Sequence, residues 1–236
     1  MSTQLEEMLG IATQSVKESS CSEEAMIDTF ALYRNAAKNP ADYAGLICNQ
    51  NVVATTVALL QCNLRKKVVA SAALAALVAL TVPTDSHLQM ATKEGMKTTQ
   101  DVMSTYEKTA LDLYTNALEI LDNLALNPSM TYSVLTAEVV KRALEAVTVL
   151  RSEEKYLVVA LSLITRLQDL DGKKRFEKDL LSDRVVETCL FALQTYSGAR
   201  TIHFCCVLLL RAMQDAKRKS TILTESTVAK LVELLT

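Results

Sequence analysis

The sequence contains few glycines, prolines and aromatic residues. Of its 236 residues, 5 are Gly, 3 are Pro and none is Trp, and only 5% are aromatic. Tight turns depend on Gly and Pro, so their scarcity argues against sandwiches, barrels and other folds with many turns. Half of the residues are hydrophobic, so the core must consist of Leu, Val, Ala, Ile and Met. This composition predicts an all-α protein.

The sequence lacks the groups of residues that several kinds of catalysis and ligand binding require. Five scattered glycines cannot form a glycine-rich phosphate loop, and the acidic residues are scattered without a paired site. His203 lies near Cys205 and Cys206, but residues two and three positions away do not both converge on one site along a helix. We expect His203 to be packed and His87 to lie in a loop or at a helix start. We therefore predict no catalytic, cofactor-binding or metal-binding residue.

The charges are balanced, with 25 basic and 27 acidic residues and a net charge of −2. No strong field therefore attracts nucleic acid or an acidic membrane, and we expect neither as a partner. The start, MSTQLEEMLG, lacks the basic and apolar segments of a signal peptide. The apolar run from Val68 to Val82 has 15 residues, short of the ~20 needed to cross a membrane. We expect it to form a buried helix that stops at Pro83.

The cysteines and a basic tract bear on the location of the protein. The six cysteines lie in apolar segments, where we expect reduced, buried thiols. This predicts a cytoplasmic protein, with a nuclear or cytoskeleton-associated location as the alternative. The tract AKRKS at 216–220 could be a nuclear import signal or a phosphate contact, but we interpret it as a solvated helix end. The cysteines are Cys21, Cys48, Cys62, Cys189, Cys205 and Cys206.

One short phrase occurs three times at nearly equal spacing. It is LTAEVV at 135–140, LSDRVV at 181–186 and LTESTV at 223–228, in steps of 46 and 42 residues. Each phrase has a hydroxyl residue suited to a helix N-cap, followed by an acidic residue in the first turn. The predicted N-caps are Thr136, Ser182 and Thr224.

A second, independent phrase has almost the same period. A small residue followed by apolar residues one, four and seven positions later begins at Ala73, Ala117, Ala160 and Cys206, in steps of 44, 43 and 46 residues. Such spacing places the apolar residues on one helix face. Two phrases that share one period indicate an internal repeat of about 44 residues.

The apolar pattern also predicts the individual helices. The polar segment near residue 92 is expected to be a short helix or loop within a diverged repeat at 84–126. Gly172 and Gly198 are expected just past helix ends. The predicted helices are 3–17, 22–38, 41–48, 51–63, 66–82, 97–104, 107–126, 136–150, 153–170, 173–181, 183–196, 200–218 and 225–236.

Three segments resemble armadillo repeats, and the period is that of armadillo and HEAT arrays. They are 51–81, with paired valines and an A-L-x-x-L-x-x-L helix, 114–125 (YTNALEILDNLA) and 174–193. The resemblance implies a right-handed α-α superhelix, an armadillo-like solenoid of about four to five repeats. Residues 1–44 would form N-terminal helices, as a cap or degenerate repeat. Residues 45–236 would form the array, with an incomplete last repeat at 221–236.

The same resemblance implies a non-catalytic scaffold or adaptor that binds a protein or peptide on the concave surface of the third helices. In arrays that hold extended peptides, asparagines line this surface; Asn123 matches, but Ala79, Arg166 and Ala212 do not. The last repeat lacks its third helix, which predicts partner binding or self-association through the C-terminal end. Candidate binding residues are Lys67, Glu119, Asp122, Asn123, Arg166 and Arg211 in the groove, and Leu231, Leu234 and Leu235 at the end.

Three alternatives to this function remain open at this stage. The first is a structural subunit of a larger cytoskeletal or axonemal assembly, with contacts on both faces and both ends. The second is an enzyme on a helical scaffold, for which the sequence supplies no group of catalytic residues. The third is a nucleic-acid-binding helical array, which the balanced charge disfavours.

Overall fold

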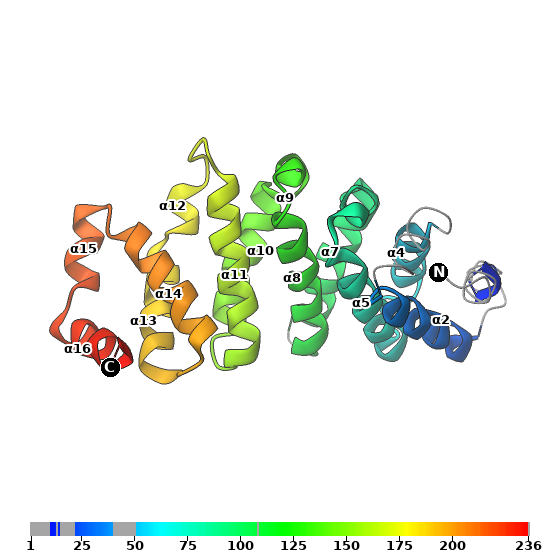
Figure 1. Ribbon diagram of the computed structural model, residues 1–236, viewed down its shortest axis with the longest axis horizontal. Coiled ribbons are helices and arrows are strands. Elements are labelled where there is room, and N and C mark those ends of the chain that lie inside the picture. Colours follow the sequence, from blue (N-terminus) through cyan, green and yellow to red (C-terminus); the bar gives the residue numbers. More distant parts are fainter. Residues whose placement is uncertain (1–9, 13, 15–21, 40–50, 108, 236) are drawn as a thin grey trace. The chain divides into compact units, whose positions relative to one another are not determined.

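The computed structural model describes residues 10–12, 14, 22–39, 51–107 and 109–235. All regular structure in these residues is helical, which confirms the all-α prediction (Figure 1). The long helices are α2 Glu23–Ala36, α4 Val52–Cys62, α5 Lys67–Thr81, α7 Lys93–Tyr106, α8 Leu111–Ala125, α10 Ala137–Val149, α11 Glu154–Leu170, α13 Asp183–Thr195, α14 Ala199–Ala212 and α16 Glu225–Leu235.

Short helices lie between the long ones. They are η1 Thr84–Ser86, α6 His87–Met90, η2 Pro128–Met130, α9 Thr131–Val134, α12 Glu177–Leu180 and α15 Ala216–Ile222. The order short, long, long therefore recurs along the chain as α6-α7-α8, α9-α10-α11 and α12-α13-α14. The pair α4-α5 precedes these groups, and α15-α16 follows them. We call α5, α8, α11 and α14 the third helices.

The chain forms two compact units, Met1–Val134 and Leu135–Thr236. In the first, α5 packs against α2, α4 and α8, and its Leu74, Leu77 and Leu80 are fully buried. The expected core helix at 66–82 is thus present, and it ends at Thr81, just before Pro83. Within the described residues, no single helix is long and apolar enough to span a membrane; α5 with the segment Thr84–Met90 would pass by length and composition, but this pair is bent by 112°.

Helix α7 differs from the sequence-based prediction. We expected a short helix at 97–104 or a loop, but α7 runs over 14 residues, with Thr92 as its N-cap. The Thr92 hydroxyl accepts a hydrogen bond from the Gly95 amide at 3.1 Å. Thr98 and Thr99 are buried, and the Thr99 hydroxyl donates to the Gly95 carbonyl at 2.9 Å. Because threonine can satisfy its hydroxyl within its own helix, a polar composition did not mark a loop here.

Replacing Gly95 by Ala is expected to destabilise the protein by a net ~1 kcal/mol. A Cβ at this position would collide with the Met90 backbone carbonyl at the end of α6. Moving backbone in a packed region costs roughly 1–3 kcal/mol, of which better helix propensity recovers roughly 0.5–1 kcal/mol. Urea-induced unfolding measures the difference. The matched control is Gly172→Ala, where a Cβ meets no atom within 4 Å; equal unfolding midpoints for the two variants would contradict the prediction.

In the second unit, α11 packs against α10 and α14, and α13 packs against α14. Two of the predicted N-caps form the expected bond: the Thr136 hydroxyl accepts from the Val139 amide at 3.3 Å, and the Thr224 hydroxyl accepts from the Thr227 amide at 3.2 Å. Ser182 occupies the N-cap of α13 but makes no side-chain cap bond.

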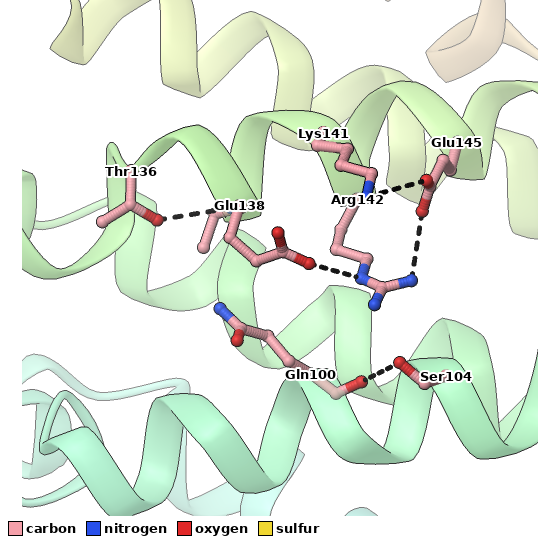
Figure 2. A network of polar contacts seen from close by, with 8 residues as sticks. Gln100, Ser104, Thr136, Glu138, Lys141, Arg142 and Glu145 are labelled. Carbon is pink, nitrogen blue, oxygen red and sulfur yellow. Dashed lines mark hydrogen bonds and ion pairs between the residues drawn. The ribbon is translucent and has the colours of Figure 1, made fainter.

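Ion pairs reinforce the first turns of α10. Figure 2 shows Arg142 between Glu138 and Glu145, at 3.1 and 3.2 Å. Glu145 also lies 4.0 Å from Lys141. Each of these pairs joins residues three or four positions apart on one helix, so the pairs stabilise α10 itself.

Several other boundaries also differ from the prediction. The expected helix 200–218 is two helices, since α14 ends at Ala212 and α15 begins at Ala216. The expected helix 173–181 shortens to α12, because the Asp171 carboxylate accepts from the amides of Arg175 and Phe176 at 2.9 and 2.6 Å and holds them in a turn. Gly198 is the N-cap of α14 rather than the cap of a helix end. The helix 41–48 and most of 3–17 lie outside the described residues.

Candidate binding surfaces on the third helices

Residues of the third helices can be compared by their position in the helix, counted from its first residue. At the thirteenth position lie Ala79 in α5, Asn123 in α8, Arg166 in α11 and Arg211 in α14. The counterpart of Asn123 in α14 is therefore Arg211, one residue before the Ala212 that the sequence pattern indicated. Asn123 and Arg211 each bond to the third helix that precedes them.

Asn123 connects α8 to α5 within the first unit. Its side-chain amide donates to the Val78 carbonyl at 3.4 Å and to the Thr81 hydroxyl at 3.2 Å. Both acceptors lie in the last turn of α5, and Asn123 is half-buried. The amide therefore links neighbouring helices; its predicted contact with a peptide remains a prediction.

Arg211 makes the corresponding connection from α14 to α11 within the second unit. One guanidinium nitrogen donates to the Thr165 carbonyl at 3.2 Å and to the Gln168 side-chain oxygen at 2.9 Å. The other pairs with Asp169 at 2.7 Å. The planar guanidinium holds three acceptors of one helix end, a geometry that a lysine cannot reproduce.

Two tyrosines make a further connection at the same spacing, which sequence reasoning missed. The Tyr106 hydroxyl donates to the Leu64 carbonyl at 2.6 Å, and the Tyr196 hydroxyl donates to the Arg151 carbonyl at 2.7 Å. Each carbonyl lies in the turn before a third helix. Burial raises the pKa of Tyr106; burial, then the nearby Glu153 and Glu154, raise the pKa of Tyr196. Both phenols therefore stay protonated and can donate at neutral pH.

A groove beside α12 is lined in part by Arg211. Two adjoining cavities of about 380 and 460 Å³ share Lys174, Glu177, Leu181, Arg211 and Gln214. We call this region the α12 groove. Two of the cations in its lining are paired, since Lys174 pairs with Glu177 at 3.1 Å and Arg211 pairs with Asp169. The groove therefore offers a polar surface with charges of both signs.

The remaining predicted binding residues lie on the third helices without forming one cluster. Lys67 is the exposed first residue of α5 and lines a separate groove between α2 and α5. In α8, Glu119 is half-buried and Asp122 is buried; in α11, Arg166 is half-buried. Their binding role is still a prediction. The side chains of Leu231, Leu234 and Leu235 in α16 lie outside the described residues.

The last third helix, α14, exposes apolar residues where its counterparts are covered. At the eighth position, Leu74 in α5 and Leu161 in α11 are fully buried, whereas Cys206 in α14 is half-buried. At the twelfth position, Thr165 in α11 is 7% exposed and Leu210 in α14 is 63% exposed. The helices α8 and α14 cover α5 and α11 on this side. No described helix covers α14 in the same way.

The cysteines differ in part from the expected buried state. Cys189 and Cys205 are buried, but Cys62 is exposed, and Cys21 and Cys48 lie outside the described residues. A hydrogen bond to Cys205, then burial, raise the pKa of Cys189 well above that of an ordinary thiol. Burial and Cys205 likewise raise the pKa of Cys206. These thiols are therefore protonated at neutral pH and poor nucleophiles.

The histidines occupy two different environments. His203, expected to be packed, is exposed and lies edge-on to the Phe204 ring at 5.4 Å between centroids. His87 begins α6, as expected for a helix start, and is buried with its Nε2 donating to the Thr81 carbonyl at 2.9 Å. Within the described part of the chain, no three His, Cys, Asp or Glu side chains gather as metal ligands.

Comparisons with protein-family models, curated proteins and solved structures found no match to this chain. They assign neither a family nor an activity. A functional proposal must therefore come from the contacts and exposed surfaces of the two units.

Proposed function

We propose that this chain is a non-catalytic scaffold or adaptor for protein–protein interactions, built as an armadillo-like superhelix of four to five repeats. It binds a protein or peptide on the surface of its third helices and through the uncovered end at α14. The observation that carries the proposal is the set of bonds between equivalent positions one period apart. Asn123, Arg211, Tyr106 and Tyr196 each reach an acceptor 42 to 46 residues earlier.

Bonds at this spacing favour an array because they join α8 to α5 and α14 to α11, and because both tyrosines reach the turn before the preceding third helix. A pair of helices cannot bury its apolar face alone, whereas stacked groups share a continuous core. Such an architecture leaves one row of helices accessible as a long binding surface.

The uncovered face of α14 supports the second part of the proposal. Leu210 is 63% exposed at a position that is buried in α11. On α16, Val228 and Val232 are exposed as well. A partner or a second copy of the chain that contacts these residues would bury them.

A charged residue at Leu210 is expected to remove the binding at this end without unfolding the protein. Leu210→Lys places a cation on an apolar contact surface, but an exposed position tolerates substitution within about 0.5 kcal/mol of stability. Affinity capture from the cells that express the protein, with quantitative mass spectrometry, should show proteins retained by the wild type and reduced about 10-fold by Leu210→Lys, a change that corresponds to 1.4 kcal/mol.

The control is Tyr132→Lys, since Tyr132 is 91% exposed on the short helix α9. It should retain the same proteins as the wild type. Sedimentation velocity over a range of concentrations shows whether the retained partner is a second copy. A wild type that stays monomeric and whose captured proteins are all unaffected by Leu210→Lys would refute binding through α14.

A further inference from the structure

A groove in the first unit lies between α2 and α5, apart from the uncovered end at α14. It has a volume of about 370 Å³. We call it the α2–α5 groove. Its lining comprises Ile27 and Arg34 from α2, and Lys67, Val68, Ser71, Ala72 and Ala75 from α5.

The floor of this groove is aliphatic. Val68 is 65% exposed, although the next residue, Val69, is fully buried. Ala72 and Ala75 are half-exposed, and as small residues they permit close approach of another backbone. The α5 residues follow one another at helical spacing along one face. An aliphatic, small-residue strip between two helices is a suitable seat for the apolar face of a third helix.

Two cations, Arg34 and Lys67, border the floor. Neither has an ion pair or hydrogen-bond partner among the described residues, and no carboxylate of these residues lines the groove. The neighbouring Lys66 differs, since it pairs with Glu23 at 2.9 Å. The exposed carboxylates of Glu24 and Asp28 are on α2 but outside the lining. The groove is therefore locally positive on a chain whose net charge is −2.

We propose that the α2–α5 groove binds an amphipathic, acidic helix of a partner protein. Aliphatic residues of this helix, three or four positions apart, contact Ile27, Val68 and the two alanines. Flanking Asp or Glu residues pair with Arg34 and Lys67. The inference rests on the proposed scaffold function and specifies the chemistry of one partner.

Other occupants fit these residues less well. Among the described residues of its lining, the groove has no aromatic side chain and only one neutral polar one, Ser71, whereas small-molecule pockets combine aromatic walls with several placed polar groups. A nucleic acid would place its phosphates over an aliphatic floor with two cations, and stacking on aromatic residues would be missing. The opposite charges and matched apolar surface favour an acidic helix.

The test is a selection from a displayed random-peptide library on the intact wild-type chain. The selected peptides should combine Leu, Ile or Val at helical spacing with flanking Asp or Glu. Fluorescence anisotropy of labelled selected peptides then measures their affinity for each variant. Binding should weaken as salt rises, because the two cations and their partners are close to solvent.

The decisive variant is Arg34→Glu combined with Lys67→Glu, which reverses both cations. It should bind the acidic peptides at least 10-fold more weakly and bind copies with Lys in place of Asp and Glu more tightly than the wild type does. Lys93→Glu combined with Lys97→Glu is the control, since it makes the same change of net charge at exposed positions of α7. The control should bind the acidic peptides as the wild type does.

Each other outcome overturns the inference in a distinguishable way. Selected peptides without acidic residues, or with equal affinity for the double variant, would place the binding surface elsewhere and leave the scaffold proposal intact. A dimer of the wild type that Arg34→Glu with Lys67→Glu dissociates would identify a second copy as the occupant. If the selection yields no binding peptide, the proposal that the α2–α5 groove binds a helix is refuted. The scaffold proposal would then depend on the capture experiment with Leu210→Lys.

Discussion

Leu161→Ala is expected to lower the free energy of unfolding by about 3 kcal/mol, whereas Leu210→Ala should change it by less than about 0.5 kcal/mol. Both leucines lie on third helices of the second unit, yet Leu161 is fully buried and Leu210 is 63% exposed. Truncation of Leu161 loses the favourable free energy of burying its side chain and leaves a cavity, while truncation of Leu210 changes only the exposed surface. The pair therefore compares the contribution of a buried and of an exposed leucine on the third helices.

Urea-induced unfolding followed by far-ultraviolet circular dichroism measures both variants. The denaturant dependence of the free energy should remain the same, since neither substitution changes the surface exposed on unfolding by much. Equal destabilisation by the two substitutions would show that α14 is covered in solution on the side that bears Leu210. Such a result would point to self-association, which sedimentation at the same protein concentration would detect.

The fold class and several local features were predictable because each depends on short stretches of sequence. The scarcity of Gly and Pro with abundant Ala and Leu indicated helices throughout, and the run 68–82 indicated α5. Thr136 and Thr224 cap their helices as expected, because the N-cap bond needs only a hydroxyl and an amide three residues later. The polar segment of α7 was less predictable, since Thr98 and Thr99 are both buried and the Thr99 hydroxyl bonds to its own helix.

Contacts between helices were not predictable to the same extent. Asn123 and Arg211 were selected as surface residues that bind a partner, yet both donate to the preceding third helix. Whether a long polar side chain points outward or reaches a neighbouring helix end depends on packing distances of a few ångström. The two tyrosines carried a usable signal, because Tyr106 and Tyr196 are separated by about two periods, but one pair among 7 tyrosines did not stand out.

The two grooves differ in what their charges can do for a partner. In the α12 groove, a ligand would have to break or share the pairs of Lys174 with Glu177 and Arg211 with Asp169. In the α2–α5 groove, Arg34 and Lys67 can pair with a ligand without loss of an internal bond. Unpaired cations also steer an acidic partner during its approach. For these reasons the α2–α5 groove is the stronger candidate for binding, although its cavity is no larger.

Arg211→Ala is expected to lower the free energy of unfolding by about 2 kcal/mol, from the loss of charge-assisted hydrogen bonds between α14 and α11. The Thr165 carbonyl and the Gln168 side chain would lose their donor. The pair with the more exposed Asp169 adds little, because solvent screens it. Arg211→Lys should fall between the wild type and the alanine variant, since one ammonium group cannot serve all three acceptors.

The matched control is Arg218→Ala in the same unit. Arg218 makes one ion pair, with Asp183 at 3.5 Å, and Asp183 is largely exposed, so its loss should cost less than about 1 kcal/mol. Thermal and urea unfolding rank the variants by their loss of stability. Repeating the measurements with added salt separates the loss of an ion pair from the loss of hydrogen bonds. Salt should weaken the contribution of Arg218 but leave most of that of Arg211, which comes from hydrogen bonds to uncharged oxygens. If salt removed the whole effect of Arg211→Ala, the pair with Asp169 would hold α14 to α11, and the hydrogen bonds would not.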